Sequence, residues 1–514
     1  EGANVRNVVT GLSAVGIIDE ALAEIQLQAG GFNAEYGGAN AGIILHDLRT
    51  GGPDWNFSLS TETDGIAGDY EKRFGTYSYG YSNQVFTASG PLLNSKTRAF
   101  IALQRNTEGS DAVYWDGFEF ADLVDTGDRG GGVHWAESTS PDTINSLKLR
   151  SGKIDHTGNE QIDINTTLLF DLNPFHVRVS GLHTMEDIEY NPSPIRNMLN
   201  TERLPEGERT ASMLNIKGTH VLDPSMFYEL NLSFYDQQRE RFGDPLMKEN
   251  WWVYNDSVAV SNYWGDTGQY TPYTTQGSIP RPYDLNGFPF NREGSPTSHV
   301  NGSDRVSWYT QDKDSYWGLA GSLTKQTSVH QIKAGFDYQK WTARRFAVAL
   351  SSIRSAISNT YPELDAVYEQ YYSGEISDSK IMDALVAKAE TLDDGDGSLL
   401  DLQRLLRVNS GTSQYGFDEF ANEIDGSADP LQKPRNPLVA SAYVQDKIEY
   451  QDLIVNAGLR YEHYYADSWR FVDPGTPKRD AKNFTMVIED STGTYMLRTR
   501  KFNEFSPRLG MSFP

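Results

Sequence analysis

A formal charge of −25, from 70 acidic and 45 basic side chains in 514 residues, argues against a nucleic-acid-binding protein, which needs a basic stripe. Hydrophobic residues make up 38% of the chain, and no apolar run approaches the ~20 residues of a spanning helix, so helical membrane insertion is excluded. The absence of cysteine excludes disulfides, thiolate metal sites and cysteine nucleophiles.

Residues 1–52 form the first predicted unit. They combine short helical and strand patterns with many Gly and Ala residues. The sequence Gly51-Gly52-Pro53 is predicted to end the preceding secondary structure. Glu1 begins no signal peptide, and the first residues resemble the middle of a domain. The last residues, SPRLGMSFP, resemble the middle of a strand. We therefore expect both ends to be truncations of a larger protein.

From Trp55 onward, period-two alternation dominates and predicts half-apolar strands. Between residues 161 and 171, for example, Ile162 and Ile164 share one face while Asp163 and Asn165 share the other. Twelve strands are predicted, near residues 54–64, 76–90, 96–107, 161–173, 175–189, 208–222, 226–240, 314–325, 329–345, 437–450, 453–466 and 501–514.

Three of these segments fit the alternation poorly. Both faces of 97–105 carry charge, Leu182 and His183 fall on the wrong sides of their segment, and Asp446 lies on the otherwise apolar face of its own.

The links between the strands alternate in length without exception. Links of a few residues, such as Asp223-Pro224-Ser225, are separated by long ones near 108–160, 191–206, 241–312, 346–436 and 468–500. An up-and-down membrane barrel with short periplasmic turns and long external loops has this pattern, and its aromatic girdles suit the 12% aromatic content. A soluble sandwich would scatter its loop lengths. In a barrel, Phe234, Phe336 and Phe513 point outward in an apolar belt.

Two long loops carry candidate binding residues. In 241–312 an aromatic cluster suggests recognition of a sugar, peptide or partner surface, and packing of its members among themselves or a place in the outer aromatic girdle is an equal alternative. The cluster consists of Trp251, Trp252, Tyr254, Tyr263, Trp264, Tyr270 and Tyr273. In 346–436, residues 362–407 predict a small helical insert. Within it, Asp394, Asp396 and Ser398 resemble part of a calcium loop without its acidic closing residue, so a solvated turn is the favoured interpretation over Ca²⁺.

The segment EIQLQAGGFNAEYGGANAGIILHDLRTGG, residues 24–52, resembles the end of the plug domain of TonB-dependent outer-membrane receptors. The matching positions are Glu24, Glu35, Tyr36, Gly37, Gly42 and Arg49. Residues 441–464 and 505–514 are similar to barrel strands of the same family. The sequence GGFNAEYGGANAG most resembles that of Bacteroidetes-type, Oar-like receptors with an N-terminal carboxypeptidase-regulatory-like domain. The residues Leu45-His46-Asp47-Leu48 depart from the family pattern, which puts the packing of the last plug strand in question.

This resemblance implies an all-β fold: a partial transmembrane β-barrel of about 12 of 22 antiparallel strands, plus the C-terminal part of a plug. Residues 1–52 would be plug and residues 53–514 barrel, with 241–312 and 346–436 as extracellular loops. The implied location is the outer membrane of a Gram-negative, Bacteroidetes-type bacterium. The implied partners are membrane lipid, a TonB-type energising complex reached through the missing N-terminus, and a surface lipoprotein or other outer-membrane subunits.

The implied function is uptake of a bulky nutrient through the plugged barrel, without covalent chemistry and without a cofactor other than the weakly supported Ca²⁺. A structural or assembly barrel that anchors a surface layer, a secretion complex or an extracellular partner is the alternative. A soluble all-β enzyme is a third interpretation. The chain contains no HExxH, P-loop or nucleophile-elbow pattern, so it is not expected to be an enzyme.

Overall fold

The chain is mostly β with a few short helices, as seen in a computed structural model. The structure describes residues 2–28, 33–38, 42–68, 72–73, 75–110, 117–120, 123–125, 133–135, 147–150, 154, 156–191, 204–242, 248, 308–349, 361–376, 380–392, 413–418, 421–426, 432–450, 453–471 and 496–513.

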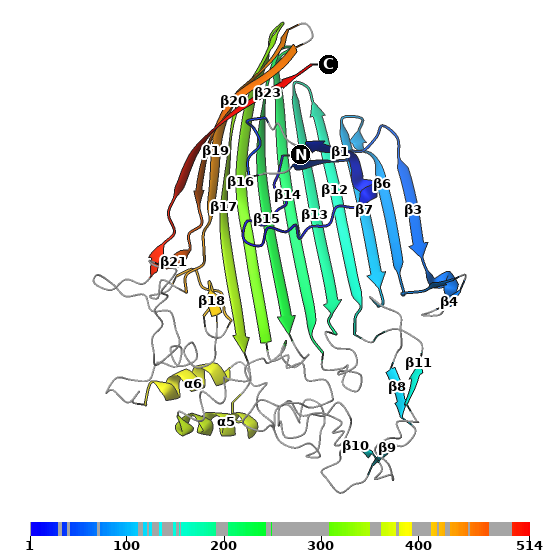
Figure 1. Ribbon diagram of the computed structural model, residues 1–514, viewed down its shortest axis with the longest axis vertical. Coiled ribbons are helices and arrows are strands. Elements are labelled where there is room, and N and C mark those ends of the chain that lie inside the picture. Colours follow the sequence, from blue (N-terminus) through cyan, green and yellow to red (C-terminus); the bar gives the residue numbers. More distant parts are fainter. Residues whose placement is uncertain are drawn as a thin grey trace.

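Twelve strands form one continuous antiparallel sheet in which each strand pairs with its neighbours in chain order (Figure 1). Each predicted strand overlaps one strand of this sheet, so the prediction of twelve antiparallel strands is confirmed. The strands are β3 (Asn56–Thr63), β6 (Ser82–Asn94), β7 (Thr97–Glu108), β12 (Asn159–Leu172), β13 (Phe175–Glu189), β14 (Glu206–Asp223), β15 (Met226–Phe242), β16 (Trp308–Gln326), β17 (His330–Ala349), β19 (Leu438–Tyr450), β20 (Leu453–Tyr465) and β23 (Phe502–Ser512).

The remaining elements are short. Three of them precede the sheet: η1 (Asp19–Ala21) and the hairpin of β1 (Leu22–Gln28) and β2 (Ile43–Leu48). The others lie in the links of the sheet: η2 (Gly65–Ala67), β4 (Lys72–Arg73), β5 (Thr76–Tyr77), β8 (Gly117–Phe120), β9 (Leu123–Asp125), β10 (Val133–Trp135), β11 (Leu147–Arg150), η6 (Pro362–Leu364), α5 (Asp365–Tyr372), α6 (Ile381–Ala389), β18 (Ser413–Tyr415), β21 (Trp469–Phe471) and β22 (Met496–Arg498). Of these, β18 adds three residues to the edge of β17.

The two ends of the sheet differ. At one end the strands are joined by tight turns, and beyond the other lie the pairs β8–β11 and β9–β10 and the helices α5 and α6 (Figure 1). We call these the turn end and the loop end. The predicted helical insert is confirmed over residues 362–389, where Leu364, Val367 and Leu385 are buried between η6, α5 and α6; its predicted remainder, residues 393–407, lies outside the described residues. No helix in the described part of the chain has the length and apolar content needed to cross a membrane.

The two faces of the sheet are chemically opposite, as the alternation predicts. One face, here called the outer face, exposes large apolar side chains: Phe234 is 42%, Phe336 41% and Phe513 77% exposed, which confirms their predicted outward direction. The other, the inner face, carries polar residues that are nevertheless buried, including Asp163 at 3% and Asn165 at 1% exposure. Buried polar groups need hydrogen-bond partners. Something must therefore cover the inner face.

The covering element is the N-terminal segment, residues 2–48, which crosses the inner face of the curved sheet (dark blue in Figure 1). Its buried apolar residues pack on apolar residues of the wall. The segment contributes Ala14, Val15, Ile18, Ala21 and Leu48, and the wall contributes Val85, Phe100, Ala102, Leu182, Ala211, Met213, Tyr235, Tyr316 and Trp341.

This packing explains a residue that breaks the alternation. Leu182 lies on the inner face because it belongs to the apolar cluster under the N-terminal segment, and it is 8% exposed. His183 consequently points outward, where its Nδ1 lies 2.8 Å from Ser212 Oγ.

Ion pairs explain the other two exceptions. On the outer face at the loop end, Arg105 Nε lies 2.8 Å from Glu160 Oε1. At the turn end, Asp446 Oδ2 lies 2.7 Å from His330 Nδ1. These two ion pairs therefore lie at the loop-end border and the turn-end border of the otherwise apolar outer face.

Candidate functional site

One attachment of the N-terminal segment to the inner face lies toward the loop end, at Asn7. This side chain is fully buried and donates from Nδ2 to Gln237 Oε1 at 3.0 Å and to Asp314 Oδ2 at 2.7 Å. Its Oδ1 accepts from the backbone N–H groups of Val9 (2.7 Å) and Thr10 (3.2 Å). One amide therefore shapes the turn of the segment and attaches it to two strands of the wall.

A second attachment holds the backbone around Gly16. The N–H of Gly16 donates to Thr184 Oγ1 at 2.7 Å, and that hydroxyl donates to Asp163 Oδ1 at 2.6 Å. Asn165 accepts from the N–H of Ile18 at 2.8 Å and donates to the carbonyl of Gly16 at 3.1 Å. A Cβ atom at Gly16 would overlap the Asp163 carboxylate, so only glycine lets the backbone approach this closely.

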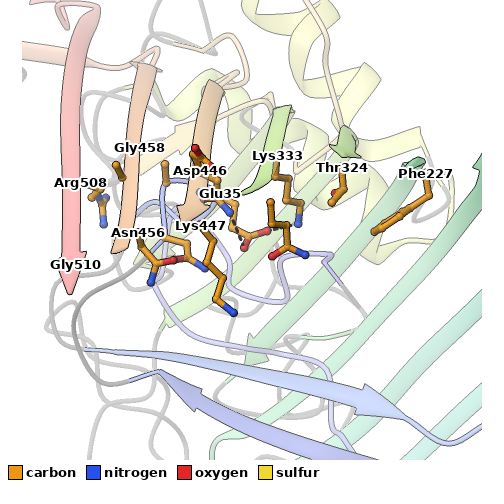
Figure 2. Close-up of a pocket in the computed structure, with 15 residues that line it drawn as sticks. Glu35, Phe227, Thr324, Lys333, Asp446, Lys447, Asn456, Gly458, Arg508 and Gly510 are labelled. Carbon is orange, nitrogen blue, oxygen red and sulfur yellow. Dashed lines mark hydrogen bonds and ion pairs between the residues drawn. The ribbon is translucent and has the colours of Figure 1, made fainter. Parts of the chain in front are cut away.

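A third attachment lies near the turn end and borders a cavity of about 170 Å³ (Figure 2). Glu35 forms an ion pair through Oε2 with Lys333 Nζ, which points toward it in Figure 2. The N–H of Glu35 donates to Gln445 Oε1 at 3.1 Å, and Gln445 Nε2 donates back to Glu35 Oε1 at 3.4 Å. Two strands of the wall thus hold both the side chain and the backbone of Glu35.

Arg460 completes this attachment from β20. It is 6% exposed and donates from Nη1 to the carbonyls of Ala34 (3.2 Å) and Glu35 (2.9 Å). Its Nε donates to Glu462 Oε1 at 2.9 Å, which orients the guanidinium. A Cβ atom at Gly37 would overlap both Glu462 and Arg460, so the glycine after Tyr36 makes room for this ion pair.

At the loop end, a cavity of about 520 Å³ opens between residues 10–14 of the segment and the ends of β13 to β17. Its charged lining is paired: Arg209 Nη2 lies 2.6 Å from Glu186 Oε2, and Arg239 Nη2 lies 2.5 Å from Asp312 Oδ2. Paired charges are held in fixed positions before a ligand arrives, and a polar ligand can exchange contacts with them. The residues of the segment that line this cavity directly follow Asn7.

These attachments bind a peptide backbone, and none of them performs a reaction. They use carboxylates, amides, a hydroxyl and an arginine as hydrogen-bonding groups on the segment. Within the described ranges, no group of three or more His, Asp or Glu side chains is placed to hold a metal ion. The contacts of the site hold one chain segment against the inner face of the curved sheet.

No protein-family model matches the chain, and no curated protein matches it. Its structure is similar to that of the outer membrane transporter YddB from Escherichia coli (TM-score 0.43, 10% identity, covering 90% of this chain and 46% of that one). It is also similar to the FrpB iron transporter from Neisseria meningitidis (TM-score 0.45, 10% identity, covering 96% of this chain and 50% of that one). A third similar structure is the siderophore receptor PiuA from Acinetobacter baumannii (TM-score 0.44, 10% identity, covering 96% of this chain and 52% of that one). The chain spans about half the length of these solved structures. The iron and the siderophore in two of these names refer to FrpB and PiuA themselves.

The six residues of the predicted plug motif lie at two places, five within the N-terminal segment and Arg49 directly after it. Glu35, Tyr36 and Gly37 lie at the turn-end attachment, where burial, followed by the charge of Glu35, raises the pKa of Tyr36 to about 12.

The other three motif residues belong to the β1–β2 hairpin and its borders. Glu24 is exposed on β1 and accepts from Gln26 Nε2 at 3.1 Å. Gly42 precedes β2, and a Cβ there would lie 3.3 Å from the Gln28 carbonyl. Arg49 donates from its backbone N–H to the Ala21 carbonyl at 2.7 Å and from Nε to the Leu22 carbonyl at 3.0 Å, which closes the hairpin.

The departure from the family pattern at residues 45–48 does not prevent strand pairing. These residues form the second half of β2, which pairs in antiparallel register with β1. Leu48 is 6% exposed and joins the apolar cluster, and its carbonyl accepts from Arg178 Nη2.

The predicted ligand-binding aromatics Trp251, Trp252, Tyr254, Tyr263, Trp264, Tyr270 and Tyr273 lie outside the described residues, as do Asp394, Asp396 and Ser398 of the predicted calcium loop. Both assignments stay predictions.

Sequence reasoning did not single out the wall residues that hold the segment, namely Thr184, Asp314, Gln445 and Arg460. The available signal was polar residues recurring on one face of strands whose other face is apolar. That signal separates the faces, but it does not identify which inner residue contacts which part of the segment.

Proposed function

We propose that this chain is part of a TonB-dependent outer-membrane receptor that takes up a bulky nutrient through a plugged β-barrel. One observation carries the proposal: a sheet with an exposed apolar outer face holds, on its polar inner face, the glycine-rich segment whose residues resemble a plug. Residues 1–52 are the C-terminal part of that plug and residues 53–514 belong to the barrel. The sequence of residues 30–42 favours a Bacteroidetes-type, Oar-like receptor in a Gram-negative outer membrane.

The proposed mechanism uses the attachments as releasable contacts. A ligand that enters the loop-end cavity touches residues 10–14, which directly follow the turn held by Asn7. Each hydrogen bond between the segment and the wall stabilises the closed arrangement by only about 0.5–1.5 kcal/mol net. A periplasmic pull, exerted by a TonB-type complex on the N-terminal part of the full-length protein, then moves the segment and opens a path. The charge of −25 favours cationic or metal-complexed nutrients by long-range attraction.

The size of the apolar outer face supports a membrane location. From Trp317 to Leu323 the outer positions of β16 are apolar or glycine, with Ser315 beyond them toward the loop end and Lys325 beyond them toward the turn end. Six residue steps of ~3.4 Å, tilted by ~40°, span about 16 Å, which fits within the ~25 Å apolar band of outer-membrane barrels.

Leu319→Arg places a charge in the middle of this band and is expected to destabilise the folded protein in lipid vesicles by roughly 2–4 kcal/mol. Ser315→Arg, on the same face of the same strand but outside the band, is expected to cost roughly 0–1 kcal/mol. Urea unfolding of the two variants in vesicles measures the difference. Equal losses would contradict a lipid-facing outer face.

Transport and scaffolding differ in their need for energy. In cells that lack the TonB system, growth on the nutrient should be lost although the protein still reaches the outer membrane, because the held segment no longer moves. Retained growth with unchanged protein would contradict energised uptake. It would favour a structural barrel that anchors a surface layer, a secretion complex or another extracellular partner.

A further inference from the structure

The loop-end cavity has a positively charged lining although the chain as a whole is acidic. Six charged side chains of the inner face line it in the described part of the chain. They are Arg209, Arg239, Arg241, Arg345, Glu186 and Asp312. The four arginines exceed the two carboxylates by two charges, whereas the net charge of the chain is −25. Inside the cavity, the lining therefore attracts anions.

Other acids near the cavity, among the described residues, face away from it. Glu208 and Glu240 alternate along their strands with the inner arginines, so only their backbone borders the cavity. Their carboxylates lie on the outer face and bind Lys248 and the Tyr309 hydroxyl. Asp314, one inner position nearer the turn end, is bound by the N-terminal segment and does not line the cavity.

Two of the arginines lie directly opposite each other. Arg209 of β14 is in register with Arg239 of β15, an unfavourable arrangement because like charges at facing positions of a sheet repel. Each arginine turns to a carboxylate on its other side, Glu186 of β13 or Asp312 of β16. An anion placed between the two strands would contact both guanidinium groups and relieve their repulsion.

The other two arginines are less fully compensated. Arg345 Nη1 lies 3.4 Å from Asp312 Oδ1, on a carboxylate that already binds a second arginine. Arg241 has no carboxylate partner among the described residues, and its guanidinium lies 4.4 Å from the centre of the Tyr190 ring. Gly207, opposite Arg241, makes room for this contact, since a Cβ there would lie 3.1 Å from the Tyr190 ring. The N–H groups of Arg241 thus remain able to bind a ligand.

The N-terminal segment adds a hydrogen-bond donor. Thr10 lines the cavity, and its Oγ1 accepts from the backbone N–H of Leu12 at 3.3 Å. Its hydroxyl proton is therefore available to an oxygen atom of a ligand. The next inner row of the wall toward the turn end contains Gln237 and Asp314, which hold Asn7. A ligand bound by the arginines would touch the segment beside one of its attachments.

We propose that this cavity binds an end of the nutrient that carries two negative charges, on carboxylates or on phosphates, an inference that rests on the proposed function. Arg209 and Arg239 bind one anionic group, and Arg241, one row nearer the loop end, binds the second. The overall charge attracts cations from a distance, but charges beyond a Debye length of about 8 Å are largely screened. The bound end is therefore anionic even where the whole nutrient is a metal complex or carries cations elsewhere.

The test is isothermal titration calorimetry of the full-length protein in detergent micelles. The probes are tricarballylate, pyrophosphate and the uncharged triamide of tricarballylic acid. An anion is expected to bind and the triamide is not, and the tighter of the two anions identifies the charged group. Arg241→Gln should weaken anion binding about tenfold, since one charge-assisted contact is lost. Glu186→Gln should tighten it roughly threefold, because a negative charge leaves the lining.

Arg105→Gln is the matched control. It changes the charge of the chain by the same amount, but Arg105 lies on the outer face and pairs with Glu160, so the affinity for anions should equal that of the parent protein. Equal weakening by Arg105→Gln and Arg241→Gln would overturn the assignment of the cavity. So would effects of the same sign in Arg241→Gln and Glu186→Gln, or failure of both anions to bind more tightly than the triamide.

The growth test in cells without the TonB system is independent of this titration. Growth that depends on the TonB system, without anion binding, would overturn only the assignment of the cavity. Anion binding combined with growth that needs no TonB system would support the cavity and overturn energised uptake.

Discussion

Gly16→Val is expected to detach the middle of the N-terminal segment from the wall. The new side chain would overlap the Asp163 carboxylate, so the backbone must withdraw and lose its bonds to Thr184 and Asn165. Leaving these buried groups unpaired costs about 4 kcal/mol in total at the usual 1–3 kcal/mol per group. Hydrogen exchange of the amides in residues 13–22 should then accelerate by roughly a thousandfold, while exchange in β14 and β15 stays unchanged.

Gly218→Val is the matched control. Gly218 lies in β14, and a Cβ atom there would meet no atom within 4 Å. It introduces the same side chain without a steric conflict, so exchange in residues 13–22 should match the parent protein. Unchanged protection in Gly16→Val would show that the segment adapts, and that close approach at this glycine does not hold it.

The wall could be predicted because its pattern is local. Ile162 and Asp163 alternate faces with every residue step, and the predicted strand 161–173 corresponds to β12. The ends of the strands were predicted less accurately where both faces of a strand become polar. β16 begins at Trp308, six residues before the prediction, because its backbone ladder continues through Thr310 and Gln311, where side-chain periodicity has disappeared.

At the turn end of the sheet, the sequence predicted the end of a strand too early. Pro91 marked the predicted start of a link, yet β6 continues to Asn94 with an irregular register after Pro91. A proline removes one backbone donor, which a strand tolerates where the ladder is already irregular.

The site could be predicted only in part because its contacts join distant positions. The plug motif identified Glu35, but its partner Lys333 lies 298 residues away and Asn7 is 307 residues from Asp314. Alternation places these partners on the inner face without fixing which one meets the segment. The inward position of Leu182 has the same origin, since it is set by contact with the segment and not by its own strand.

Arg460→Ala is expected to release the turn-end part of the segment, residues 33–38. The arginine supplies charge-assisted hydrogen bonds to the carbonyls of Ala34, which is buried, and Glu35, which is half-buried. At ~1.5 kcal/mol for each such bond, the loss is roughly 3 kcal/mol, so local opening becomes about a hundredfold more frequent. In planar bilayers, the full-length variant should show conductance bursts that the parent protein lacks.

Two further variants identify the cause. Arg508 lines the same cavity from β23 without a hydrogen bond or ion pair to a described residue, so Arg508→Ala removes a similar volume and charge and should remain silent (Figure 2). Arg460→Lys keeps the charge but has no planar fork to reach both the carbonyls and Glu462, so an intermediate burst frequency is expected. Bursts in Arg508→Ala equal to those in Arg460→Ala would assign the effect to the lost charge near the cavity. The graded order, with alanine above lysine above arginine at position 460, would instead show that the guanidinium contacts to the backbone keep this part of the segment closed.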